Sequence, residues 1–121
     1  MEKDFVPYEE SLALKELGFD EPCNTCYDKL EMVASYGASV FDYKNYNTTG
    51  YMVSRPTFSQ AFRWFREKYD VHLGICHMYG KFDCWTNNGD LLENGKYCDF
   101  KTYEEAEQAC LDKLIEITKN K

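Results

Sequence analysis

The sequence lacks the features that mark membrane, secreted and nucleic-acid-binding chains. Its first ten residues, MEKDFVPYEE, contain no apolar segment of the kind found in signal peptides, and no run of about 18 apolar residues follows. Basic residues are in deficit, with 14 Lys and Arg against 21 Asp and Glu, for a formal net charge of −7. We therefore expect a soluble, cytoplasmic protein with no membrane contact and no general nucleic-acid binding.

The motifs of the common enzyme classes are also missing. The chain has no Gly-rich phosphate loop, no nucleophile elbow and no H-E-x-x-H zinc motif. Its two histidines, His72 and His77, would point to opposite faces of a strand, which prevents them from forming a catalytic pair. We therefore expect a protein that is not an enzyme and that uses no cofactor.

Cysteine, by contrast, is plentiful, and two of the six residues form a C-x-x-C motif at Cys23 and Cys26. Such a pair is half of a tetrahedral zinc site. The second half would have to come from the segment 76–84 or from Cys98, where the spacing of ligands is irregular. A redox pair would need to begin a helix, whereas this pair follows one. We expect no bound metal; if zinc were present, Cys23 and Cys26 would be its ligands.

The other four cysteines stand at positions that face the predicted core. In a cytoplasmic protein, such thiols are usually small buried hydrophobic groups and not disulfide partners. We therefore expect free thiols at Cys76, Cys84, Cys98 and Cys110.

Length and composition indicate a globular chain with ample apolar material. The 121 residues are 44% hydrophobic and 17% aromatic, enough for a single domain over residues 1–121 with its own core. The aromatic share includes 10 Tyr and 8 Phe, whose large side chains supply both core and contact surfaces.

Three segments have the periodicity of helices. The first covers 8–17 and ends at Gly18, followed by Phe19 as its closing hydrophobic contact. The second runs from about 57 to 69, and the third from about 103 to 119. The second and third begin with the capping-box pairs Thr57–Gln60 and Thr102–Glu105.

Short strands are predicted between and after these helices. They fall at 25–33, 40–43, 51–54, 71–79, 82–86 and 96–100. Hairpin-like connections favour an antiparallel sheet of about four to six strands, in the order α-β-β-(β)-α-β-β-β-α, with the helices mainly on one face. The sequence thus predicts an α+β fold; the alternative is an α/β sandwich with helices on both faces.

Three stretches carry a resemblance to a known group of proteins. PYEESLALKELGFDEPC, RPTFSQAFRWFREKY and TYEEAEQACLDKLIEI resemble a family of small uncharacterised proteins from Bacteroidetes genomes and from phages that infect these bacteria. The alternation of helices and strands is also similar to small phage domains with an α/β-sandwich fold. The resemblance implies an accessory protein of a phage or mobile element, made in a bacterial cytoplasm.

The leading functional hypothesis is a protein-binding module that acts on a host or phage protein. Tyrosines give large, rigid contact area, and aromatic residues dominate interface hot spots. A Tyr-rich loop over 36–51 would supply such contacts; alternatively, its tyrosines cover the core. The candidate binding residues are Tyr36, Tyr43, Tyr46, Tyr51 and Trp64, the last of which lies either at the core edge or on the surface.

Three further functions stay open. An acidic protein could inhibit a host-defence or DNA-processing enzyme by offering carboxylates where DNA phosphates bind. The chain could also bind a nucleotide, with aromatic rings on the base and Arg55, Arg63 and Arg66 on the phosphates. A structural or assembly subunit, such as a homodimer formed along an exposed strand edge, is the last alternative.

Overall fold

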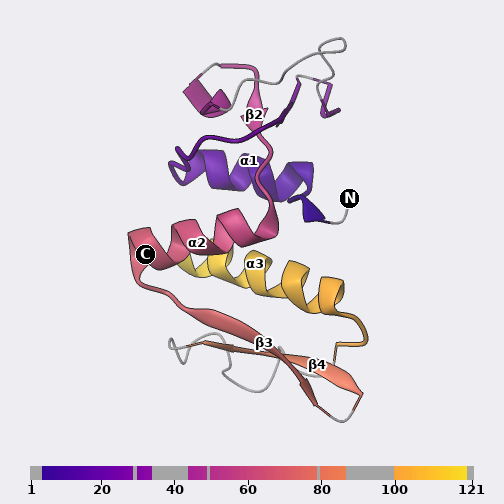
Figure 1. The fold of residues 1–121 in the computed structure, drawn as a ribbon. Helices are drawn as coiled ribbons and strands as arrows, with labels where there is room; N and C mark the ends of the chain where they lie inside the picture. The colour runs from indigo at the N-terminus through magenta and orange to yellow at the C-terminus, as the bar shows by residue number, and fades with distance from the viewer. Residues whose placement is uncertain are drawn as a thin grey trace. The chain divides into compact units, whose positions relative to one another are not determined.

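The computed structural model describes residues 4–28, 30–33, 44–48, 50–78, 80–86 and 100–119 (Figure 1). Within these ranges it contains three α-helices, one short 3-10 helix and four β-strands. The prediction of an α+β fold is therefore confirmed. The chain divides into two compact units, Met1–Gln60 and Ala61–Lys121. Whether they form the single domain predicted over 1–121 is not tested by this division, and that domain stays a prediction.

The first unit begins with helix α1, Tyr8–Glu16, which has the ends that the sequence predicts. Gly18 has φ of 97°, and its N–H donates to the carbonyl of Lys15 at 3.0 Å. The N–H of Phe19 donates to the carbonyl of Leu14 at 2.9 Å, while the Phe19 ring is buried. These two bonds form a Schellman motif, which is why the helix stops here.

A two-stranded antiparallel sheet completes the first unit together with a 3-10 helix. Strand β1, Cys26–Tyr27, pairs with β2, Val53–Ser54, and the 3-10 helix η2 covers Tyr46–Thr48. The buried apolar side chains of this unit are Val6, Leu14, Phe19, Cys23, Cys26, Tyr27, Tyr46, Val53 and Phe58.

The predicted strand over 25–33 is wrong beyond Tyr27. One carboxylate oxygen of Asp28 accepts the backbone N–H groups of Leu30 and Met32, at 2.8 and 3.2 Å. Glu31 takes a φ of 64°, which no strand residue adopts. An aspartate that binds its own following backbone makes a turn, and this turn ends the strand. The predicted strand 40–43 lies outside the described residues.

Helix α2, Phe58–Tyr69, begins at the end of the first unit and continues into the second. The hydroxyl of Thr57 accepts the N–H of Gln60 at 3.1 Å, so the predicted N-terminal cap forms. The Gln60 side chain, however, donates to the carbonyl of Pro22. Of the predicted capping box, the half made by the Thr57 hydroxyl is therefore present.

The second unit contains a hairpin and helix α3 (Figure 1). Strand β3, Leu73–Met78, pairs with β4, Lys81–Thr86, in antiparallel register from Leu73 opposite Thr86 to Met78 opposite Lys81. Helix α3, Tyr103–Lys119, packs against both strands. The buried apolar side chains of this unit are Ala61, Phe62, Trp64, Phe65, Val71, Cys84, Ala106, Cys110, Leu111, Leu114 and Ile115.

Sheet size is the part of the fold prediction that is not confirmed. The described strands form two sheets of two strands each, and not one sheet of four to six. Of the predicted strand 96–100, only Phe100 is described, and it forms a single antiparallel bridge with Phe82. Its N–H and carbonyl bond the backbone of Phe82 at 3.0 and 2.8 Å. Among the described helices, none combines the length and apolar character needed to cross a bilayer.

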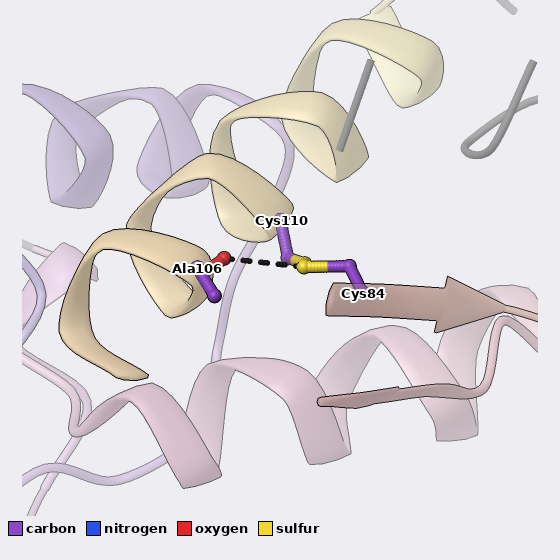
Figure 2. Close-up of a disulfide and its surroundings, with 3 residues drawn as sticks. All are labelled: Cys84, Ala106 and Cys110. Atoms are coloured by element: carbon purple, nitrogen blue, oxygen red, sulfur yellow. Dashed lines mark hydrogen bonds between the residues drawn. A yellow bond between two sulfur atoms is a disulfide. The ribbon is translucent and has the colours of Figure 1, made fainter. Parts of the chain in front are cut away.

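A disulfide joins the hairpin to helix α3 in the second unit. Cys84 on β4 is bonded to Cys110 on α3, with 6.7 Å between their Cα atoms (Figure 2). The prediction of free thiols at these two residues is therefore wrong, although the predicted inward positions are right, since both side chains are buried. Burial follows from local periodicity, whereas pairing across 26 residues depends on how helix and strand pack.

Candidate functional site

The predicted tyrosine surface is only partly present among the described residues. Tyr51 is 61% exposed and keeps its place on the surface. Tyr46 is only 4% exposed, so a surface position for it is wrong: it lies in the short helix η2 and packs with Cys26 and Met52. Tyr36 and Tyr43 lie outside the described residues.

The sequence allows Trp64 to lie either at the edge of the core or on the surface, and the structure places it in the core. Its side chain is 3% exposed. Its ring meets those of Phe65 and Tyr69 edge-on, with centroids 5.1 and 5.5 Å away. The buried face of α2 is thus wide enough to include a residue far from its centre, so Trp64 lies in the core, and its role in binding stays a prediction.

The C-x-x-C pair is a buried feature of the first unit. Among the described residues, neither Cys23 nor Cys26 forms a disulfide, and their side chains are 1% and 0% exposed. The thiol of Cys23 donates weakly to the Glu21 carbonyl and to Oε1 of Gln60, each at 3.7 Å. Burial raises the pKa of Cys23 from 9.0 to about 12, so the thiol stays protonated at neutral pH. A protonated thiol is a poor nucleophile.

Arg55, one of the three arginines considered for phosphate binding, is also buried in the first unit. Its guanidinium lies over the ring of Phe5, 4.1 Å from the centroid, and its Nε donates to the Tyr27 hydroxyl at 3.4 Å. The Tyr27 hydroxyl donates in turn to the carbonyl of Val6 at 2.7 Å. These contacts hold Arg55 in the packing of the unit. Arg63 lies on the exposed side of α2, with its Nε 3.9 Å from Oε1 of Glu67.

The second unit carries an open groove along the first half of α3. Its volume is about 530 Å³, within the range of ligand sites in proteins. Its lining residues are Phe100, Glu104, Glu105, Gln108, Ala109 and Asp112. The α3 residues among them alternate with the buried Ala106 and Cys110, so the groove lies on the side of the helix away from its packed face.

Polar contacts hold two of the groove carboxylates in place. The N–H of Glu105 donates to the Thr102 hydroxyl at 3.1 Å, while the Glu105 carboxylate accepts the N–H of Lys101 at 3.3 Å. Farther along the groove, the amide of Gln108 donates to both carboxylate oxygens of Asp112, at 3.3 and 3.4 Å. Each of these two carboxylates keeps further lone pairs that can accept hydrogen bonds.

Aromatic rings continue from the groove onto the hairpin. Phe100 lines the groove and pairs with Phe82, whose ring stacks on His77 with centroids 4.7 Å apart and meets Tyr103 edge-on at 6.0 Å. Tyr103 is 44% exposed. Partial burial raises the pKa of its hydroxyl, and the carboxylates of Glu107 and Glu104 add to the rise. The groove therefore joins apolar and aromatic surface to negative charge.

Reasoning from the sequence missed this groove. Glu104 and Glu105 lie in the first turn of a helix, where acidic residues are favoured by the helix dipole, so their presence there gives no reason to look for a second role. The available signal was the spacing of Glu104, Gln108 and Asp112, which puts three polar residues on one exposed stripe beside Ala109. The position of Phe100 against this stripe was not readable from the chain. No family model, curated protein or solved structure matches this chain.

Proposed function

We propose that this chain is a non-enzymatic protein-binding module and that the groove on α3 is its binding surface. The observation that carries the proposal is the groove itself, in which Phe100 and Ala109 lie beside Glu104, Glu105 and Asp112. Apolar contact area bordered by polar groups is the usual composition of a protein interface.

The biological setting of the proposal comes from the resemblance of the sequence to small proteins of Bacteroidetes and their phages. We place the chain in a bacterial cytoplasm as a phage or mobile-element accessory protein that binds a host or phage protein. Enzymes of host defence and DNA processing are a suitable partner class, because their DNA-binding surfaces are basic and the chain carries a net charge of −7.

The disulfide is compatible with that location because of its burial. Cys84 and Cys110 are 5% and 2% exposed. Reduction requires a thiolate to reach one of the two sulfur atoms, and access controls the rate of that attack. A disulfide enclosed by helix and strand is therefore shielded from cytosolic reductants once it has formed.

The proposal is tested by obstructing the groove. Ala109→Arg puts a long side chain into the groove. Ser59→Arg introduces the same side chain at an exposed position of α2 outside the groove. Immobilised wild type and both variants are used to capture proteins from a lysate of the host, with quantitation by mass spectrometry. We expect at least one protein that wild type and Ser59→Arg retain equally and that Ala109→Arg retains about tenfold less. Equal retention by all three proteins would refute the groove as the binding surface.

A further inference from the structure

We infer that the groove on α3 takes a basic segment of the partner protein, with an arginine or lysine side chain lying along it. The aliphatic part of that side chain contacts Phe100 and Ala109, and its cationic end lies among the carboxylates of Glu104, Glu105 and Asp112. This inference rests on the proposed function and specifies the chemistry of the partner.

The lining of the groove matches the two-part character of a long basic side chain. Arginine and lysine bury their methylene groups on apolar surface while the charged end stays with polar groups or water. An acidic or wholly apolar segment would instead desolvate the three carboxylates without pairing them, which is costly. Charge complementarity therefore selects a basic segment over the other two kinds.

The carboxylates are arranged for an extended organic cation, and not for a metal ion. Within the described part of the chain, no three His, Cys, Asp or Glu residues are placed to hold a metal. Asp112 lies two turns of α3 beyond Glu104, so the negative charge is spread along the helix. A guanidinium or ammonium group on a chain of methylenes can meet such a row, and successive basic residues can meet successive carboxylates.

Aromatic rings next to the row favour arginine in particular. Guanidinium groups lie over aromatic faces, and one such contact is present elsewhere in this chain, between Arg55 and Phe5 at 4.1 Å. Phe100 offers such a ring at the groove. The negative charge of the whole chain adds long-range attraction for a basic partner, which accelerates association.

The test uses a fluorescein-labelled peptide of alternating arginine and alanine, followed by fluorescence anisotropy. The groove variant combines Glu104→Gln with Asp112→Asn. The matched control combines Glu16→Gln with Asp20→Asn, which removes the same two charges from exposed positions of the first unit. We expect the Kd to rise about fivefold or more in the groove variant and less than about twofold in the control, at low ionic strength.

Several outcomes overturn the inference. They are an equal loss of affinity in both variants, which would indicate net charge alone; no measurable binding of the arginine peptide; and equal binding of a matched glutamate–alanine peptide. Circular dichroism and thermal unfolding establish that both variants fold. If Ala109→Arg abolishes capture of a host protein while the groove variant retains it fully, the proposed function stands and the basic-segment inference fails. If Ala109→Arg changes no capture, the proposed function fails independently of the peptide result.

Discussion

Reducing the disulfide between Cys84 and Cys110 should lower the free energy of unfolding by about 3.5 kcal/mol. The bond closes a loop with a sequence separation of 26 residues. In the chain-entropy treatment, a loop of that length restricts the unfolded state by about 12 cal/mol/K, which gives about 3.5 kcal/mol at 25 °C. Because whole domains are stable by only about 5 to 15 kcal/mol, this is a large share of the total.

Reduction removes the cross-link without changing any residue. The sulfur of Cys84 lies 3.4 Å from the carbonyl oxygen of Ala106 (Figure 2). After reduction, the Cys84 thiol can therefore donate to that oxygen. We expect the native secondary structure to persist and the loss to be confined to the loop-closure contribution.

The assay compares urea unfolding of the oxidised and fully reduced chain, followed by circular dichroism. For a chain of this size, the loss corresponds to a fall in Tm of about 10 to 15 °C. Intact mass under non-reducing conditions establishes that the oxidised sample is lighter by two hydrogen atoms. A variant with Cys84→Ala and Cys110→Ala is the control, since reductant should leave its stability unchanged.

Two results would contradict this reasoning. The first is a reduced protein whose free energy of unfolding lies within about 1 kcal/mol of the oxidised one, which would mean that loop closure contributes little. The second is an equal response of the double alanine variant to the reductant, which would place the effect at other residues.

Three further changes test the local structure. Thr25→Val should stabilise the chain by about 1 kcal/mol in urea unfolding, since the Thr25 hydroxyl is buried and has no hydrogen-bond partner among the residues that the structure describes. A loss of stability would show that the hydroxyl is bonded. Gly18→Ala should lower the free energy of unfolding by about 1 kcal/mol, because Gly18 has a φ of 97°, which strains a residue with a Cβ. The added Cβ itself meets no atom within 4 Å, so the loss would come from backbone strain alone, and an unchanged urea midpoint would refute this argument. The pKa of Cys23 rises from 9.0 to about 12 on folding, so its contribution to stability is complete below pH 9 and is lost as the pH rises toward 12. In Cys23→Ala, the free energy of unfolding should therefore fall less between pH 9 and pH 12 than in the wild type. Identical curves for the two proteins would contradict the raised pKa of Cys23.

The helices were predictable because their signals are local. Gly18 and Phe19 end α1 through bonds to residues three and five positions earlier. Thr57 and Thr102 begin α2 and α3 by accepting an N–H three residues ahead. Each signal is complete within one or two turns of chain, so tertiary packing is not needed to interpret it.

The errors arose where side-chain hydrogen bonds override the local pattern of apolar residues. The alternation over 25–33 favours a strand, but the side chain of Asp28 bonds the backbone that follows and turns it. Tyr46 is buried although its surroundings in the sequence are polar, because its N–H bonds the Ser54 hydroxyl at 2.9 Å and β2 lies beside it. In both places hydrogen bonds between a side chain and the backbone decide the outcome, and periodicity carries no information on them.

The sequence by itself determined the α+β class, the three helices, the hairpin of the second unit and the excess of negative charge. These follow from residue spacing and composition, which act over a few neighbours. Only the tertiary structure decided that Cys84 meets Cys110 and that Phe100 pairs with Phe82 beside the exposed carboxylates of α3. Both contacts join segments far apart in the chain, and their free energy depends on the packing of helix and hairpin as a whole. The groove depends on that packing, because the sequence indicates the polar stripe on α3 but not that Phe100 lies against it.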